Sequence, residues 1–202
     1  MSSEAAISEV RKILEPLPIT VSECTELYAL DHKTMQAYQD SYLEKHPDAA
    51  QNYTIKDTLT EEDDCYLICF RISQGDLPVT QYGYTHLADY RTVEGSVVKV
   101  FYSAKGIINI SVTGAYRAKS VCGNSGDLIS AEQAIELAIK TKLIAEDDVH
   151  ITVINSCLEY VGVPYSKTVG EVLLTPAWNI TVRMEGACET VHINASTGEV
   201  IK

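Results

Sequence analysis

Two stretches, VHINASTGEVIK (residues 191–202) and KVFYSAKGIINI (residues 99–110), decide how the chain is divided. When Gly198 is set over Gly106, both read as an apolar-rich segment, a turn of small residues, a glycine and a second apolar segment. Two apolar segments joined by a short glycine-containing turn are typical of a β-hairpin. The same hairpin pattern therefore occurs twice in the sequence, which predicts a duplicated structural unit.

The segments before each hairpin follow one order, a helix and then strands. Asp31 is the expected N-cap of a first helix that Pro47 ends, and Ser130 with Gln133 forms a capping box before a second helix. Strand-like segments follow: NYTIKDTL, CYLICFRIS, SVVKVFYSA and GIINISVTGAY in the first half, and VHITVINSCLEYV, VLLTPAWNITVRM and ETVHINA in the second. Their links are too short for crossover helices, so antiparallel pairing is expected. The predicted fold class is α+β, with two helix-plus-antiparallel-sheet modules in tandem.

The expected modules are residues 31–122 and 123–202, preceded by an N-terminal segment, residues 1–30, with a short helix at Ala5–Leu14. In the first module, the helical spacing of Met35, Tyr38, Tyr42 and His46 predicts that they share one face of a helix. In the second module, Ala134, Ile135, Ala138, Ile139 and Leu143 share such a face. Tyr66 is set over Trp178 by the alignment of the halves, and we expect Trp178 to be a core residue packed against the helix.

Composition excludes several classes of protein. The chain has 202 residues, 46% of them hydrophobic, which is enough for a real core. Its net charge of −12, with 16 Lys plus Arg, argues against nucleic acid as a partner. No apolar run approaches the roughly twenty residues that span a bilayer, and residues 2–14 do not resemble a signal peptide. We expect either a cytoplasmic protein or the mature or trimmed part of an exported one.

Six cysteines stand at positions 24, 65, 69, 122, 157 and 188, without a C-x-x-C pair. A zinc ribbon or thioredoxin-type redox site is therefore poorly supported. Cys65 and Cys69 lie on one face of a predicted strand, roughly 13 Å apart, so they cannot bond to each other. The even count permits disulfides, but free thiols that behave as small apolar side chains are the favoured interpretation.

The second half resembles a known type of module. Its features are Glu132–Ala134 in a helix, Tyr160 at the end of a strand, Pro176–Trp178 opening another strand, and Asn194–Val200 in the last hairpin. They resemble the C-terminal module of the YycI and YycH regulatory proteins, the PepSY-type domains and related uncharacterised lipoproteins of Gram-positive bacteria. The first half looks like the more divergent partner module. Its Gly75–Pro78 departs from the G-I-P pattern that is usual there.

The resemblance implies a PepSY-like or cystatin-like fold in an extracytoplasmic protein. In the native protein a lipid or an N-terminal membrane helix would tether it, and this chain contains no such span. Members of these families are thought to bind or regulate envelope proteins, including sensor kinases and peptidases, without catalysis. The implied partner is therefore an unidentified envelope or membrane protein.

The residues themselves offer little catalytic chemistry. The five histidines lack H-x-x-x-H or H-E-x-x-H spacing, and no G-x-S-x-G elbow or histidine–cysteine dyad is indicated. His192 is interpreted as a solvated or hydrogen-bonded surface residue. The acidic runs Glu61–Asp64 and Glu146–Asp148 lack the spacing of a calcium loop and are expected to be solvated turns. We expect no catalytic residues, no metal site and no cofactor.

The stretch VTQYGYTHLADYRTVEG (Val79–Gly95) is an insert that the second half lacks. Tyrosine and arginine are enriched at interface hot spots. The candidate binding residues are Tyr82, Tyr84, His86, Tyr90 and Arg91. The alternative is an ordinary pair of strands covering the sheet.

The expected function is that of a noncatalytic extracytoplasmic binding or regulatory domain that acts through protein–protein contacts. The alternative is a small-molecule carrier or small enzyme that uses a concave sheet face as a pocket. A pocket lined by convergent polar groups would favour the alternative. A packed sheet–helix interface together with exposed aromatic side chains would favour protein binding.

Overall fold

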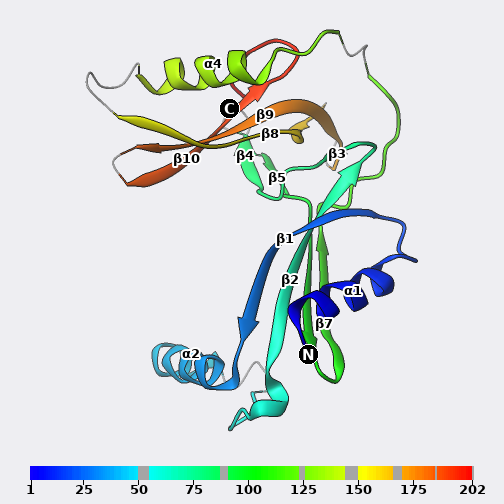
Figure 1. The fold of residues 1–202 in the computed structure, drawn as a ribbon, viewed down its shortest axis with the longest axis vertical. Coiled ribbons are helices and arrows are strands. Elements are labelled where there is room, and N and C mark those ends of the chain that lie inside the picture. The colour runs from blue at the N-terminus through cyan, green and yellow to red at the C-terminus, as the bar shows by residue number, and fades with distance from the viewer. Residues whose placement is uncertain are drawn as a thin grey trace. The chain divides into compact units, whose positions relative to one another are not determined.

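A computed structural model of the chain describes residues 1–49, 55–86, 91–122, 126–143, 150–165, 170–184 and 186–201. The fold is α+β, with antiparallel sheets as the sequence predicts. Contacts divide the chain into two units: unit 1 is Met1–Arg71 with Val97–Val112, and unit 2 is Ile72–Ser96 with Thr113–Lys202. Figure 1 shows the elements of both units.

Unit 1 is built on a sheet with the strand order β1-β2-β6-β7. Its elements are α1 (Ser3–Leu14), β1 (Thr20–Leu30), α2 (His32–Lys45), η1 (Glu61–Asp63), β2 (Cys65–Gln74), β6 (Val97–Ser103) and β7 (Gly106–Thr113). The helix at Ala5–Leu14 is confirmed, and so are the strands predicted at CYLICFRIS, SVVKVFYSA and GIINISVTGAY. Strand β1 was not predicted, because its residues were assigned to a separate N-terminal segment.

Helix α1 covers one face of this sheet. Ser2 caps the helix by accepting a hydrogen bond from the Ala5 backbone N–H, and Ala6, Val10 and Leu14 are buried at i, i+4 and i+8. Opposite them, the strand residues Ile68, Phe70, Val98 and Val100 are fully buried and share one face by their register. The Arg11 guanidinium lies over the Phe70 ring, 5.1 Å from its centroid, which places α1 on this face.

Helix α2 is confirmed, with the predicted start and end. Asp31 caps it as expected, and it ends at Lys45 before Pro47. However, none of its residues is buried, and the face that carries Tyr38 and Tyr42 is largely exposed. This face does not contribute to the core, because α1 occupies the apolar face of the sheet.

Unit 2 contains the second helix and a three-stranded sheet in the order β10-β9-β8. Its elements are β3 (Leu77–Pro78), β4 (Tyr84–His86), β5 (Arg91–Val93), α4 (Ala131–Leu143), β8 (Ile151–Pro164), β9 (Val172–Met184) and β10 (Ala187–Asn194). The capping box is confirmed, because the Ser130 backbone N–H donates to Gln133 and the Gln133 N–H donates back to the Ser130 hydroxyl. The strands predicted in this half are confirmed as β8, β9 and β10.

Helix α4 packs on one face of this sheet, as Figure 1 shows. The buried cluster between them is formed by Ala134, Ala138, Ile180, Val182, Val191 and Ile193. Trp178 is partly buried at the edge of the cluster, and its indole Nε1 donates to the Ile129 carbonyl at 2.9 Å. The expectation of a packed helix–sheet interface is confirmed for this unit.

The contacts divide the chain differently from the predicted boundaries. Residues 1–30 belong to unit 1, because β1 pairs with β2. Residues 72–96 belong to unit 2, because the Thr80 N–H donates to the Tyr160 carbonyl at 2.8 Å and Val79 forms a parallel bridge with Tyr160. The insert at Val79–Gly95 is therefore anchored in unit 2, and Val79, Thr80 and Val93 are buried there.

The described part of the strand predicted at NYTIKDTL is not a strand. Residues 55–60 instead form an irregular segment beside α2, and η1 follows, so that the acidic run Glu61–Asp64 forms the turn before β2 as expected. Side-chain amides of α2 bind the backbone of this segment, which replaces the hydrogen bonds that a sheet would have supplied. The run Glu146–Asp148 lies outside the described residues.

Gly95, the last residue of the insert, lies very close to the backbone of Gln81. A Cβ atom at this position would collide with the Gln81 carbonyl group, so Gly95→Ala is expected to destabilise unit 2 by about 1 to 3 kcal/mol through overpacking. Gly126→Ala is the matched control, because a Cβ atom there would have no neighbour within 4 Å. Chemical denaturation followed by circular dichroism measures both. Equal midpoints for the two variants would contradict the close packing of Gly95 against Gln81.

Candidate functional site

The residues predicted for binding lie on and beside the β4–β5 hairpin. Tyr82 is exposed at 59%, ahead of β4. Tyr84 and His86 lie in β4, and the His86 backbone pairs with Arg91 of β5. Tyr90 lies outside the described residues. The hairpin therefore brings His86 and Arg91 to one cross-strand position, and the role of these residues in binding stays a prediction.

A second candidate is the surface formed by residues 31–49 and 55–64, which we call the α2 surface. Its aromatic side chains are unusually exposed: Tyr38 by 74% and Tyr42 by 43%. The ring of Tyr42 lies 4.7 Å from that of His46, so these two side chains extend the aromatic face toward the end of the helix. An isolated helix of 14 residues is only marginally stable in water, so other contacts must hold α2 in place.

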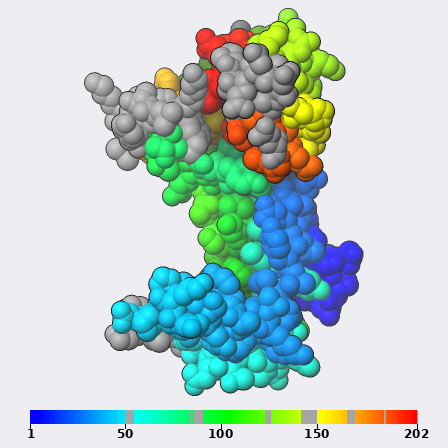
Figure 2. All heavy atoms as spheres, turned by 90° about the vertical axis from the view of Figure 1, so that its left-hand side faces the viewer, coloured from blue at the N-terminus to red at the C-terminus, as the bar shows by residue number. Residues whose placement is uncertain are grey.

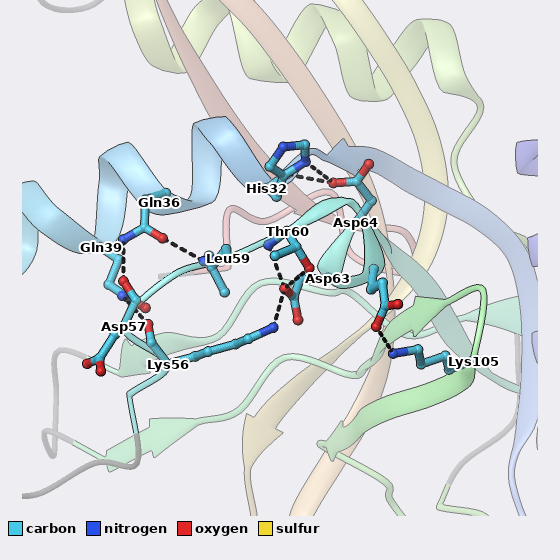
Figure 3. Close-up of polar contacts among 11 residues, drawn as sticks. His32, Gln36, Gln39, Lys56, Asp57, Leu59, Thr60, Asp63, Asp64 and Lys105 are labelled. Atoms are coloured by element: carbon cyan, nitrogen blue, oxygen red, sulfur yellow. Dashed lines mark hydrogen bonds and ion pairs between the residues drawn. The ribbon is translucent and has the colours of Figure 1, made fainter.

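Polar contacts from residues 55–64 hold α2 along one side, as Figure 3 shows. The Gln36 side-chain oxygen accepts a hydrogen bond from the Leu59 N–H at 2.8 Å, and Gln39 donates to the Lys56 carbonyl at 2.9 Å. At the start of the helix, the backbone N–H of His32 donates to Asp64 at 2.7 Å, and its ring Nδ1 lies 2.8 Å from the same carboxylate oxygen. The helix is thus positioned by hydrogen bonds and its aromatic face is left uncovered.

The segment that holds α2 is itself organised by charged groups (Figure 3). The Asp63 carboxylate accepts from the Thr60 N–H at 2.7 Å and lies 2.6 Å from Lys56 Nζ. The hydrogen bond from Lys56 is the main cause that lowers the pKa of Asp63 to about 2, and the Thr60 N–H adds to it. The pKa of Asp64 is lowered by His32, and that of Glu62 by Lys105. These carboxylates are therefore ionised throughout the physiological range.

A shallow open groove runs between α2 and the segment beside it. Asp40 and Lys33 from the helix and Asp57 from the segment line the groove together with His32 and Gln36, so its charged side chains are two carboxylates and one ammonium group. Gln36 Nε2 donates to the Asp40 carboxylate at 2.8 Å and approaches the Asp57 carbonyl oxygen at 3.4 Å. Figure 2 shows the helix and the neighbouring segment side by side on an exposed face. The groove is therefore open to a ligand that carries positive charge.

Negative charge is concentrated in this part of unit 1. Residues 31–64 contain nine Asp or Glu and three Lys. The remainder of unit 1 contains five acidic and five basic residues, so it is balanced. The whole excess negative charge of the unit is carried by the segment that contains the exposed aromatic face.

Unit 2 contains a different polar cluster, on the face of the sheet opposite α4. Glu159 of β8 is 1% exposed, and its Oε1 accepts a hydrogen bond from Asn179 Nδ2 at 2.9 Å. His192 Nε2 lies 3.3 Å from the same oxygen, and Cys157 Sγ lies 4.0 Å from Glu159 Oε2. The expectation of a hydrogen-bonded His192 is confirmed. Because the carboxylate has almost no contact with solvent, we assign this cluster a structural role.

Cys24, Cys65 and Cys69 are poor nucleophiles, because the pKa of each thiol is raised. All six thiols are free, as expected, but only Cys65 and Cys69 are buried like small apolar side chains, and Cys122 and Cys188 are exposed. Burial is the largest cause that raises the pKa of Cys24, Cys65 and Cys69, which keeps these three thiols protonated near neutral pH. Across the described residues, no group of three His, Cys, Asp or Glu side chains is placed to hold a metal ion.

The helices that the structure describes are too short and too polar to cross a bilayer. The α2 surface is not evident from the spacing of Met35, Tyr38, Tyr42 and His46, because the same spacing is found on buried and on exposed helix faces. The types of these four side chains, however, indicate an exposed binding face. Tyrosine, methionine and histidine replace the Leu, Ile and Val that dominate buried helix faces, and such amphipathic or adaptable side chains are common at interfaces.

Comparisons with known proteins bear on the fold. No protein-family model matches the chain, and no curated protein matches it in sequence. The crystal structure of an uncharacterized protein from Eubacterium rectale is similar, with a TM-score of 0.65 and 18% sequence identity. The similarity covers 100% of this chain and 56% of that protein, so the chain spans little more than half the length of its structural neighbour. At this identity the similarity shows a shared fold and nothing further.

Proposed function

We propose that the chain is a noncatalytic binding or regulatory domain that acts outside the cytoplasm, through contacts with another protein of the cell envelope. The single observation that carries the proposal is the α2 surface. A helix without a buried residue is held by hydrogen bonds on one side and presents Tyr38 and Tyr42 to solvent. Tyrosine supplies large contact area at low entropic cost, and it is enriched where binding energy concentrates.

The arrangement of polar groups supports binding more than catalysis. The buried carboxylate of Glu159 is enclosed, and the burial of Cys65 and Cys69 keeps their thiols protonated. A reaction needs a reactive group that a substrate can reach. The exposed aromatic face of α2 instead offers area for a macromolecule to cover.

We also propose that the two units are divergent copies of one PepSY-like or cystatin-like plan. In each unit a helix packs on an antiparallel sheet, α4 on the second sheet and, on the first, α1 in place of the helix after Asp31 that the alignment of the two halves pairs with α4. Superposition of the β2-β6-β7 and β8-β9-β10 strands, each with the helix that covers them, tests this proposal. Helices on opposite faces after superposition would exclude a common plan.

The double substitution Tyr38→Ser and Tyr42→Ser is expected to abolish partner capture while the fold is kept. Truncation of an interface hot spot costs about 2 kcal/mol or more, which weakens binding at least about thirtyfold. Neither side chain is buried, so the circular dichroism spectrum and the denaturation midpoint should change little. The measurement is photo-crosslinking from benzoylphenylalanine placed at position 41, an exposed position of α2 that neither substitution changes, in an envelope extract of the source cells, followed by mass spectrometry.

Two variants serve as controls. Tyr165→Ser removes another tyrosine that is 48% exposed, and it should leave capture unchanged. Tyr82→Ser tests the insert as the competing contact surface. Loss of the captured partner with Tyr82→Ser, but not with the double substitution in α2, would move the contact surface to the β4–β5 hairpin.

A further inference from the structure

We infer that the partner presents a positively charged polypeptide segment to the α2 surface. This inference rests on the proposed function and adds to it the chemistry of the partner. It starts from the distribution of charge: residues 31–64 hold nine acidic and three basic residues, while the rest of unit 1 is balanced. A surface of one sign attracts partners of the opposite sign and repels others.

The positions of these charges would allow a segment of the partner to lie across helix α2. Residues 38 and 42 fall on one side of α2, and residue 40 falls roughly opposite them, because successive helical residues are about 100° apart. With side chains, a helix is only about 10–12 Å across. A partner segment that crosses over α2 would therefore contact the tyrosines on one side of the helix and the groove lined by Asp40 and Asp57 on the other side.

The groove can receive a Lys or Arg side chain. The Asp40 and Asp57 side chains are exposed on its two walls, and Gln36 fixes Asp40 by a hydrogen bond of 2.8 Å. Charge-assisted hydrogen bonds between an ammonium or guanidinium group and a carboxylate are stronger than neutral ones. On the opposite side of the helix from the groove, the tyrosine faces can stack on a guanidinium group or cover an apolar side chain.

The remaining acidic groups keep the surface negative. Glu62, Asp63 and Asp64 each have a basic neighbour that lowers their pKa, so they stay ionised well below neutral pH. Lys33, Lys45 and Lys56 partly offset the charge, and so does Lys105 from outside residues 31–64: Lys56 is paired with Asp63 and Lys105 with Glu62. The partner must therefore supply a net positive charge to complement what is left.

The test uses the complete purified chain and three labelled synthetic peptides of equal length. They share the same leucine positions and differ only in whether the intervening positions are Lys, Gln or Glu. Fluorescence anisotropy should show binding of the Lys peptide, at least about tenfold weaker binding of the Gln peptide, and no binding of the Glu peptide. The affinity for the Lys peptide should fall as salt is raised, because salt screens exposed charges.

The variant Asp40→Asn with Asp57→Asn should weaken the Lys peptide about fivefold or more. The matched control is Glu15→Gln with Glu23→Gln, which removes the same charge from exposed positions of unit 1 outside residues 31–64. That control should bind within about twofold of the unchanged chain, since screening confines the effect of surface charges to about 10 Å. Benzoylphenylalanine at position 38 should crosslink to the bound Lys peptide.

Equal weakening by the two double variants would overturn the inference, because it would assign binding to the net charge of the chain. Equal binding of the Lys and Gln peptides would overturn it as well. If the partner captured through Tyr38 and Tyr42 survives the Asp40→Asn and Asp57→Asn substitutions, the charge inference fails while the proposed function stands. If the Tyr38→Ser and Tyr42→Ser variant still captures the partner, the proposed function fails at this surface.

Discussion

Replacement of Trp178 by alanine is expected to lower the free energy of unfolding by about 3 to 5 kcal/mol. Trp178 lies in the central strand β9, between its cross-strand neighbours Leu158 and Ile193, and packs against the cluster beneath α4. Truncation leaves a cavity there. It also leaves the Ile129 carbonyl without the indole N–H that reaches it at 2.9 Å. Both losses fall on the interface that joins α4 to its sheet.

Trp178→Phe separates the two contributions. It keeps an aromatic ring but removes the hydrogen bond to Ile129, so we expect a smaller loss, of about 1 kcal/mol. The measurement is guanidinium denaturation followed by circular dichroism, because Trp178 is the only tryptophan and its fluorescence disappears with it. An unchanged midpoint for Trp178→Ala would mean that Trp178 is not a core residue.

The part of the fold that could be predicted from sequence is the part fixed by local patterns. Helix α4 begins at the capping box formed by Ser130 and Gln133, and the helical spacing of Ala134 and Ala138 matches their burial against the sheet. The hairpin after β10 turns where the repeated motif places Gly198, whose φ of +75° favours glycine. Each of these signals lies within a few residues of the structure that it specifies.

Unit 1 was harder to predict because it has two helices and only one of them packs on the apolar face of the sheet. The patterns of α1 and α2 both suggest an amphipathic helix. Only α1 supplies small and aliphatic side chains that pack closely, Ala6, Val10 and Leu14. Strand β1 was missed because its partners are β2 residues far along the chain, as the bond from the Ser22 hydroxyl to the Arg71 carbonyl shows. Pairing at such separation has no local signature.

The division into units depends on backbone contacts that no side-chain pattern reports. The bridge between Val79 and Tyr160 attaches the insert to β8, and the Thr80 N–H confirms the attachment through the Tyr160 carbonyl. A backbone donor can be supplied by almost any residue, so the sequence of the insert does not reveal it. The same limit applies to the α2 surface, where Gln36 and Gln39 bind backbone groups.

The cluster around Glu159 could not be predicted until the register was known. Asn179 is the cross-strand partner of both Cys157 and His192, and Glu159 lies two residues along β8 from Cys157. These residues are spread over three strands, and each resembles an ordinary polar position in isolation. The register brings them together on one face of the sheet.

Removal of the Glu159 side chain, by Glu159→Ala, is expected to destabilise unit 2 by about 3 to 5 kcal/mol. The side chain is 1% exposed, so its loss creates a cavity. It also leaves the Asn179 amide and the His192 ring without the carboxylate that both approach. Guanidinium denaturation followed by tryptophan fluorescence measures the change, because Trp178 reports on the same sheet.

Two further variants show whether the loss comes from the buried cluster. Glu159→Gln keeps the volume and can still accept from Asn179, so it should cost clearly less than Glu159→Ala. Glu136→Ala removes an exposed acid on α4 and should change stability by no more than about 0.5 kcal/mol. If Glu159→Ala unfolds at the same midpoint as Glu136→Ala, the cluster contributes nothing to the fold.

Asn179 provides the sharpest comparison within the cluster. Its Nδ2 donates to Glu159, but its Oδ1 is buried and has no hydrogen-bond partner among the described residues. Asn179→Ala therefore removes one good hydrogen bond and, with it, the cost of one unsatisfied acceptor, which is about 1 to 3 kcal/mol. We expect Asn179→Ala to be less damaging than Glu159→Ala. The reverse order would mean that the carboxylate is stabilised mainly by Asn179, and that His192 contributes little.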